Sequence, residues 1–292
     1  MKRLLVIRPG GIGDCILSLP ALGQLRKHFE VHAWVPTTVV ELYRSQGIAS
    51  KSLTHMGMYA LDTPAASKGL VVKFRDYDQI ISWNSELVFQ RFCAHLGVRD
   101  ITFFDPLQEC DEMHMADFFM WQCQKFIDRP VVTPINAIPN LYVPRLGTED
   151  YMVIHPFSGS PLKNWGLVGF EDVAGMISTL PVWCAEPGVD WSGLAGRAKA
   201  MFPPCKNLYQ LAHRLTSARC YLGNDSGVTH MAAALGIPTV ALFRSTNPAT
   251  WGPRGQYTRI LAGKQITVEN VKNLVEEALQ YERNTRCGNI PA

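Results

Sequence analysis

The sequence lacks the cysteine patterns of a metal or redox site. Its eight cysteines include no CxxC pair and no Cys/His spacing of the kind that binds zinc, and several of them lie within apolar runs. Cysteines in such runs usually pack in the core as small hydrophobic residues. We therefore expect free thiols in a reducing cytoplasm.

Long apolar runs are also missing. No stretch of about 18 apolar residues occurs, so the sequence predicts no membrane-spanning helix. The chain opens like a signal peptide, but the apolar run that follows Lys2 and Arg3 ends after four residues, which is too short for one. The expected location is the cytoplasm, and peripheral contact with the inner face of the cytoplasmic membrane stays open.

Charge is not concentrated in either half of the chain. Residues 1–147 carry 15 basic and 14 acidic side chains, and residues 148–292 carry 13 and 11, which together give a net charge of +3. This balance does not predict a nucleic-acid partner. With 292 residues, 47% of them apolar and 18% charged, the composition is typical of a compact, enzyme-like protein of about two domains.

Short apolar runs alternate with helical periodicity along the chain, which is typical of a parallel, doubly wound α/β sheet. The expected strands are 4–7, 31–35, 79–83, 101–104, 151–154, 182–184, 220–222 and 239–243. The longer expected helices are 86–96, 112–127, 170–180, 208–216, 228–235 and 268–281. A segment with four prolines, 129–147, separates the two series. We therefore expect two α/β domains, 1–147 and 148–292.

Three turns between a strand and a helix hold the candidate site residues, because ligands of open α/β sheets collect at the carboxyl ends of strands. The first is Arg8-Pro9-Gly10-Gly11-Ile12-Gly13-Asp14, in which Gly11 and Gly13 allow close backbone approach to an acceptor or phosphate. It is not a dinucleotide fingerprint, since Ile16 stands where the third small residue belongs. Asp14 is either a helix N-cap worth about 1 kcal/mol or a carboxylate that accepts a proton from a bound hydroxyl.

The second turn runs from His155 to Trp165 and contains Lys163. A lysine in a loop of Gly, Ser and Pro suits the capture of a phosphate, although a lone lysine is more often simply solvated. Glu186 follows the next expected strand, where an acidic side chain can accept hydrogen bonds from both hydroxyls of a ribose.

The third turn, Gly223-Asn224-Asp225-Ser226-Gly227, leads into an alanine-rich helix. The backbone N–H groups of Ser226 and Gly227 would lie at the positive end of that helix, which makes an anion site. His230 lies one turn further along. It is either a core histidine or, together with Asp225, a contact to the same ligand.

The three turns together resemble glycosyltransferase family 9, the ADP-heptose:lipopolysaccharide heptosyltransferases. The resemblance rests on three motifs, which follow in order over nearly the whole chain: Gly11-Ile12-Gly13-Asp14, His155-Pro156 with Lys163-x-Trp165, and Gly223-Asn224-Asp225-Ser226-Gly227-x-x-His230. It implies a GT-B fold, in which two Rossmann-like, doubly wound α/β domains face each other across a cleft. The domain 1–147 would bind the acceptor and the domain 148–292 the nucleotide-sugar donor.

The resemblance also implies an activity. The chain would transfer a heptose or related sugar from ADP-heptose to a hydroxyl of a lipopolysaccharide core or similar lipid-linked glycan, with inversion and without a metal or other cofactor. Asp14 would be the general base, Lys163 would contact the donor diphosphate, and Glu186 would bind the adenosine ribose. The remaining groups around the donor sugar and phosphates would be Asp225, Ser226, Gly227 and His230.

Arg244 departs from the family pattern. Glycine is common after the strand 239–243, and this chain instead has a bulky cation beside the expected phosphate or sugar site. Two alternatives therefore stay open: a transferase that uses another nucleotide sugar, and a degenerate relative that binds a nucleotide or glycan without catalysis. A nucleotide-sugar epimerase or hydrolase, which would act without an acceptor, is a further alternative.

Overall fold

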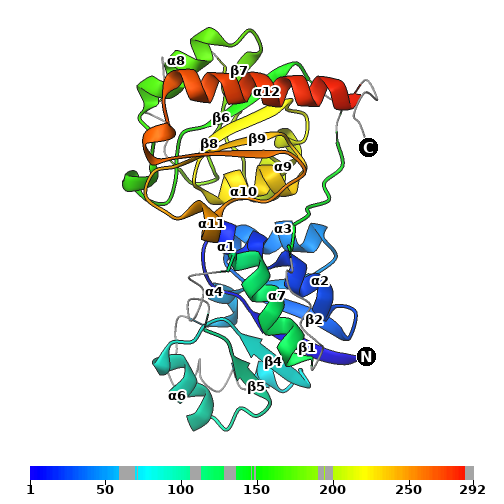
Figure 1. Ribbon diagram of the computed structural model, residues 1–292. Helices are drawn as coiled ribbons and strands as arrows, with labels where there is room; N and C mark the ends of the chain where they lie inside the picture. The colour runs from blue at the N-terminus through cyan, green and yellow to red at the C-terminus, as the bar shows by residue number, and fades with distance from the viewer. Residues whose placement is uncertain are drawn as a thin grey trace. The chain divides into compact units, whose positions relative to one another are not determined.

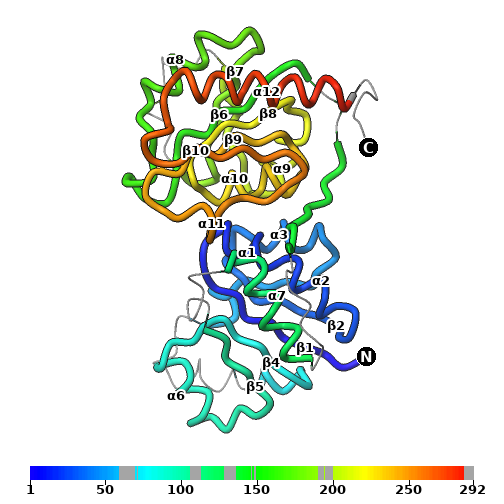
Figure 2. Tube along the Cα trace, in the orientation of Figure 1, coloured from blue at the N-terminus to red at the C-terminus, as the bar shows by residue number. Residues whose placement is uncertain are grey.

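The computed structural model of the chain describes residues 1–58, 70, 72–105, 113–127, 136–145, 147, 149–189, 194 and 200–286. The chain forms two compact units, Met1–Ala137 (unit 1) and Ile138–Ala292 (unit 2), and its path through each can be followed in Figures 1 and 2. The division falls within the proline-containing segment 129–147, earlier than the expected boundary after residue 147.

Unit 1 contains a sheet of five parallel strands in the order β3-β2-β1-β4-β5. The strands are β1 (Lys2–Ile7), β2 (Phe29–Val35), β3 (Ala49–Ser52), β4 (Gln79–Ser82) and β5 (Ile101–Phe103). The helices are α1 (Ile12–Leu17), α2 (Leu19–Leu25), α3 (Val40–Ser45), α4 (Leu53–Met56), α6 (Leu87–His95) and α7 (Met115–Phe126), with a 3-10 turn η1 (Thr37–Val39). Because β2 and β3 lie on one side of β1 and β4 and β5 on the other, the topological switch point lies between β1 and β4.

The central strand of unit 1 is buried on both faces. All four residues from Leu4 to Ile7 have no exposed surface. Leu5 and Ile7 join a cluster with Met56 of α4 and Phe89 of α6, while α7 packs against α1 and α2 (Figure 1). A strand covered in this way is uniformly apolar rather than alternating, which is why the run 4–7 is recognisable in the sequence.

Unit 2 repeats this architecture with five parallel strands in the order β10-β9-β8-β6-β7. The strands are β6 (Tyr151–His155), β7 (Leu180–Trp183), β8 (Cys220–Asn224), β9 (Thr239–Phe243) and β10 (Thr258–Ala262). The helices are α8 (Leu167–Met176), α9 (Leu208–Leu215), α10 (Gly227–Ala234), α11 (Pro248–Trp251) and α12 (Val268–Arg286), with 3-10 turns η2 (Pro161–Lys163) and η4 (Gly263–Gln265). Helices α8 and α12 pack together on one face of the sheet, and α9 and α10 pack together on the other (Figure 1).

The fold class expected from the sequence is confirmed, since both units are parallel, Rossmann-like α/β domains. Each expected strand overlaps a strand of the structure, whereas the edge strands β3 and β10 were not expected. The helix expected at 170–180 was wrong at its end: α8 stops at Met176 and β7 begins at Leu180. Leu180 precedes Pro181, and a residue before proline is disfavoured in the α conformation.

Two expectations from composition can be compared with the described residues. The six cysteines in this part of the chain are free and buried, as expected, while Cys110 and Cys287 lie outside the described residues. Within the same ranges, no helix is long and apolar enough to cross a bilayer.

Candidate functional site

The β1–α1 turn places Asp14 in the first turn of a helix rather than at its N-cap. Gly10 has a φ of 110°, a value that favours glycine, and the chain enters α1 at Ile12 with Gly11 as the N-cap. Of the two alternatives for Asp14, the N-cap is therefore wrong, and the role as a proton acceptor stays a prediction. Asp14 Oδ2 instead accepts a hydrogen bond of 2.8 Å from the Gly11 N–H, and the Asp14 side chain is 32% exposed. Gly13 lies in the first turn of α1, beside Asp14, and the binding of an acceptor or phosphate by Gly11 and Gly13 stays a prediction.

Arg8 holds this turn in place through hydrogen bonds to its backbone. It is only 2% exposed. Its Nη2 donates to the Asp14 carbonyl at 3.0 Å and lies 3.6 Å from Asp14 Oδ1, while Nη1 donates to the Pro9 carbonyl at 2.7 Å. The guanidinium carbon lies 4.5 Å from the ring centroid of Phe119 and 5.4 Å from that of Trp83. Sequence reasoning missed Arg8, although a cation directly after a buried strand was the available signal.

In unit 2, Lys163 and Asp225 form an ion pair. Lys163 ends η2, Asp225 follows β8, and Lys163 Nζ lies 2.7 Å from Asp225 Oδ2. The carboxylate is 5% exposed and also accepts a hydrogen bond from the Thr246 hydroxyl, whereas the Lys163 side chain is 30% exposed. Lys163 is therefore not a simply solvated lysine. Thr246 is a contact that the sequence did not suggest.

Asn224 holds the Lys163 loop against the end of β8. Its side chain is fully buried. Asn224 Oδ1 accepts a hydrogen bond of 2.9 Å from the Trp165 N–H, and Nδ2 donates to the Pro156 carbonyl at 2.7 Å. Arg244 is exposed and donates from Nη1 to the Asn164 carbonyl at 2.7 Å, so this cation too is attached to the Lys163 loop.

The third turn forms the N-terminus of α10, as expected. Ser226 is the N-cap, and its hydroxyl accepts a hydrogen bond of 3.3 Å from the Thr229 N–H. Gly227 is the first residue of the helix. His230 is 5% exposed, and every residue from Val228 to Ala234 is buried, which favours the interpretation of His230 as a core histidine.

Glu186 contacts a buried histidine. Glu186 Oε2 lies 3.1 Å from Nε2 of His155, the fully buried last residue of β6. The other ring nitrogen of His155 lies 3.3 Å from Ser226 Oγ. Contacts on both ring nitrogens orient the imidazole, so His155 connects the loop after β7 with the N-terminus of α10.

The expected donor residues thus meet at one edge of the unit 2 sheet. Glu186, Lys163 and Asp225 follow β7, β6 and β8, which are adjacent parallel strands, and Ser226 begins α10. Asp14 lies at the carboxyl end of β1, the corresponding edge of unit 1. Such edges are where open α/β sheets bind ligands. Among the described residues, no group of three or more His, Cys, Asp or Glu could hold a metal ion.

Comparison with known families identifies unit 2 directly. Residues 147–278 match the model of glycosyltransferase family 9 (heptosyltransferase). Most of unit 2 is therefore similar to glycosyltransferase family 9, and the chain is a glycosyltransferase. This glycosyltransferase is 20% identical to the lipopolysaccharide core heptosyltransferase OpsX of Haemophilus influenzae, over 99% of the chain and 89% of that relative. A match of 40% identity to lipopolysaccharide heptosyltransferase 1 of Pseudomonas aeruginosa covers 21% of the chain and 18% of that relative.

Solved structures extend the likeness over both units. The E. coli ADP-heptose lps heptosyltransferase II superposes with a TM-score of 0.76 at 17% identity, over 97% of the glycosyltransferase and 100% of that structure. The E. coli heptosyltransferase WaaC with ADP gives a TM-score of 0.73 at 16% identity, over 94% and 99%. The GT-B fold implied by the sequence is thereby confirmed.

Proposed function

We propose that this glycosyltransferase transfers a heptose or related sugar from ADP-heptose to a hydroxyl of a lipopolysaccharide core or similar glycan. The names of the relatives support this donor and this acceptor class. The observation that carries the proposal is the pairing of Lys163 with Asp225 beside the N-terminus of α10. A cation, a helix N-terminus and a carboxylate are the groups needed to bind a diphosphate and the hydroxyls of its sugar.

Unit 2 would bind the donor. Lys163 would leave Asp225 for the donor diphosphate, and Asp225 would then accept hydrogen bonds from sugar hydroxyls. The N–H groups at Ser226 and Gly227 would face the phosphates from one side and His230 would support them from within α10. Glu186, oriented by His155, would accept hydrogen bonds from the ribose hydroxyls of the adenosine.

Unit 1 would bind the acceptor, with Asp14 as general base. The acceptor oxygen attacks the anomeric carbon while Asp14 takes its proton, and the bond from that carbon to the phosphate oxygen breaks. ADP leaves with the electron pair of this bond. A single in-line displacement inverts the anomeric centre, so one carboxylate suffices and no second carboxylate nucleophile is needed.

The same geometry supports a reaction without a metal. The leaving ADP gathers negative charge, which Lys163 and the positive end of α10 can stabilise, each such preorganised donor lowering the barrier by roughly 3 kcal/mol. The acceptor would be attached to a lipid, so the enzyme would work in the cytoplasm in peripheral contact with the inner face of the membrane.

A thermal-shift series with ADP, UDP, GDP and CMP tests the donor. A nucleotide at 100 times its dissociation constant stabilises a protein by roughly 2.7 kcal/mol, so selective stabilisation by ADP is the expected result. Selective stabilisation by UDP or GDP would mean that the donor is a UDP-sugar or a GDP-sugar and not ADP-heptose. No shift with any of the four would reject the donor site.

A transfer assay with Asp14→Asn tests the base. The variant should keep the thermal shift with ADP, since Asp14 is not in unit 2, and lose turnover by about 10² to 10⁴-fold. Turnover within a few-fold of the unsubstituted enzyme would remove Asp14 from the mechanism. Release of free sugar from ADP-heptose at the full rate without an acceptor would make the enzyme a hydrolase.

A further inference from the structure

Arg244 has no role in the proposed function, although it lies at the edge of the unit 2 sheet where Glu186, Lys163 and Asp225 meet (the donor edge). It directly follows β9, which is the neighbour of β8 in the sheet. Arg244 is exposed, and its Nη1 donates a hydrogen bond of 2.7 Å to the Asn164 carbonyl. No carboxylate among the described residues pairs with its guanidinium, so the positive charge is available to a ligand.

The charged side chains of the donor edge alternate in sign. The strands β9, β8, β6 and β7 are neighbours in this order, and they lead to Arg244, Asp225, Lys163 and Glu186. Within the described part of the loops after these strands, no other Asp, Glu, Lys or Arg occurs. Two carboxylates and one lysine alone would make the edge net negative, which repels an anionic diphosphate. Arg244 brings the net charge of these loops to zero.

The order of the strands also places Arg244 next to one phosphate of the donor. In the proposed function Glu186 binds the ribose, so the nucleoside would lie at β7 and the diphosphate would extend from there towards β9. The phosphate that carries the sugar, here called the outer phosphate, is the one further from the ribose. It would therefore come nearer to Arg244 than the inner phosphate does. Because Arg244 already contacts the residue after Lys163, it lies within reach of the ligand that Lys163 would bind.

The backbone on both sides of Arg244 is held close to Asp225. The Asp225 N–H donates to the Leu242 carbonyl at 2.9 Å, and the Thr246 hydroxyl donates to Asp225 Oδ2. These contacts hold Arg244 beside the ion pair of Lys163 with Asp225. Only the side chain of Arg244 has to turn for it to meet a ligand there.

A guanidinium is well suited to a phosphate, because its N–H groups form a planar fork that binds two phosphate oxygens at once. Binding would release the hydrogen bond to the Asn164 carbonyl, which lies at the surface where water can replace it. When the sugar leaves, the bond from the anomeric carbon to the outer phosphate breaks and the electron pair stays on the phosphate oxygen. Negative charge therefore grows at the outer phosphate, where a cation stabilises the transition state more than the bound donor.

We propose that Arg244 binds the outer phosphate of the donor and stabilises the charge that this phosphate gains as the sugar leaves. The proposal rests on the proposed function, because it needs a nucleoside diphosphate sugar bound by unit 2. It gives a catalytic role to the residue by which this chain departs from the family pattern.

Calorimetry with ADP and AMP tests the contact in the full chain, since AMP lacks the outer phosphate. For Arg244→Gln we expect the Kd of ADP to rise about tenfold and the Kd of AMP to stay within about twofold. Arg244→Lys, which keeps the charge but not the fork, should recover part of the loss. The kcat of transfer from ADP-heptose should also fall about tenfold in Arg244→Gln, because the stabilised charge grows during the reaction.

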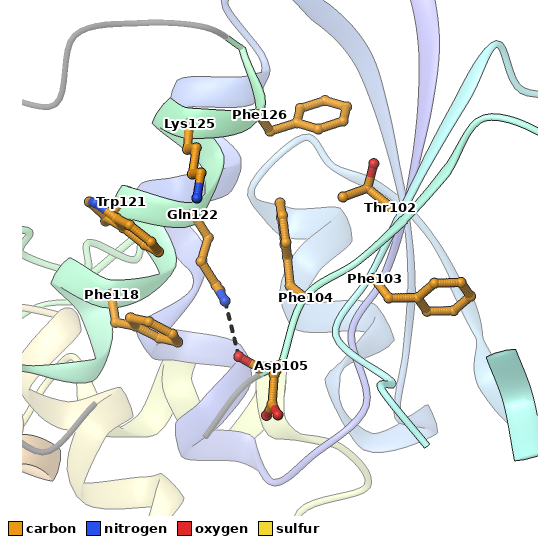
Figure 3. Close-up of a pocket in the computed structure, with 9 residues that line it drawn as sticks. All are labelled: Thr102, Phe103, Phe104, Asp105, Phe118, Trp121, Gln122, Lys125 and Phe126. Atoms are coloured by element: carbon orange, nitrogen blue, oxygen red, sulfur yellow. Dashed lines mark hydrogen bonds between the residues drawn. The ribbon is translucent and has the colours of Figure 1, made fainter. Parts of the chain in front are cut away.

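Two variants control for the loss of a positive charge. Arg259 is an exposed arginine of β10 in the same unit, and its guanidinium carbon lies 4.2 Å from the Tyr257 ring centroid. Lys125 is an exposed cation of α7 in unit 1, which Figure 3 shows among the residues that line a hollow there. Arg259→Gln and Lys125→Gln should leave the Kd of ADP unchanged. An equal rise in these variants would overturn the contact, because the loss of any positive charge would then weaken ADP binding.

A double-mutant cycle with Lys163→Met separates a direct contact from an effect through the Lys163 loop. A residue that acts only by holding this loop has no further effect once the Lys163 side chain is gone. We therefore expect Arg244→Gln to raise the Kd of ADP about tenfold in the Lys163→Met background as well. No further rise would overturn the direct contact and would make Arg244 a residue that only positions Lys163.

The outcomes also separate this proposal from the proposed function. If the unsubstituted chain does not bind ADP, the proposed function fails whatever Arg244 does. If the chain binds ADP and Arg244→Gln binds it equally well, only the contact of Arg244 is overturned. An unchanged Kd of ADP with a raised KM for ADP-heptose would mean that Arg244 contacts the sugar, which also overturns the contact with the phosphate.

Discussion

Arg8 Nη2 lies 3.6 Å from Asp14 Oδ1 and 3.0 Å from the Asp14 carbonyl oxygen. The guanidinium is buried against the rings of Trp83 and Phe119, so its position is set by β4 and α7 rather than by the turn itself. The orientation of the proposed base therefore depends on residues distant in the sequence.

Arg8→Met should reduce the rate of sugar transfer without weakening the binding of the donor. The substitution removes the guanidinium donor to the Pro9 and Asp14 carbonyl oxygens, although the Asp14 oxygen keeps the Ser18 N–H at 3.2 Å. It also removes the cation beside the carboxylate. We expect kcat to fall about 100-fold with an unchanged donor KM, because small displacements of a catalytic group cost that much. We also expect a loss of about 1–3 kcal/mol in the free energy of unfolding, measured in urea. Arg8→Lys, which keeps the charge, should be intermediate, and an unaltered kcat in Arg8→Met would show that the Asp14 turn holds its shape alone.

Removing the charge of Lys163 should weaken ADP binding, whereas removing the charge of Asp225 should not. Lys163→Met removes a charge-assisted contact and should weaken ADP binding about 10- to 100-fold in calorimetry. Asp225→Asn removes the carboxylate that competes with the diphosphate for Lys163, so ADP should bind as tightly or more tightly while transfer from the sugar donor falls. Lys264→Met, an exposed lysine of the same unit, is the matched control. Weaker ADP binding in Asp225→Asn would count against the exchange of partners by Lys163.

Stability should decline in alkali because buried acids stay protonated in the folded state. Burial raises the pKa of the Cys15 and Cys220 thiols from 9.0 to about 12, and it raises the pKa values of the Tyr43 and Tyr221 hydroxyls well above 10.0. At a pH between the pKa of such a group in the unfolded chain and its pKa in the folded chain, the folded chain holds more protons. The free energy of unfolding therefore falls as the pH rises above about 9. Each thiol contributes a slope of up to about 1.4 kcal/mol per pH unit.

Urea unfolding at pH 8, 9 and 10 measures this slope. Cys220→Ala should have a shallower decline than the unsubstituted chain, because it has one buried thiol fewer. A free energy of unfolding that stays constant over this range would mean that the thiols become accessible before the chain unfolds.

Replacement by alanine should change the stability in opposite directions at two glycines of unit 2. A Cβ at Gly255 would lie 2.4 Å from the Ala233 carbonyl oxygen, which is backbone of α10, so Gly255→Ala should cost about 1–3 kcal/mol of stability. A Cβ at Gly175, within α8, meets no atom within 4 Å, so Gly175→Ala should stabilise by about 0.4–1 kcal/mol. Thermal unfolding of the two variants compares them directly. Equal effects would mean that the loop at Gly255 shifts away from α10 at no cost.

The sequence alone determined the architecture and the position of the candidate site within it. Buried parallel strands are uniformly apolar, so runs such as 4–7 and 239–243 were recognisable. The polar strand β3, Ala49–Ser52, has no such run and was missed. The motif residues Asp14, Lys163 and Asp225 could be placed at strand ends because these positions follow from the order of elements, and their catalytic and binding roles stay predictions.

Only the tertiary structure decided which groups touch. Arg8 contacts Phe119 and Trp83, Lys163 contacts Asp225, and Trp83 after β4 donates a hydrogen bond to Gln122 of α7. Apolar periodicity and turn motifs are local signals, whereas these contacts join residues that are far apart in the chain. Their geometry depends on how the helices pack on the two sheets. A local sequence pattern does not give the distance between two side chains that come together only when the chain folds.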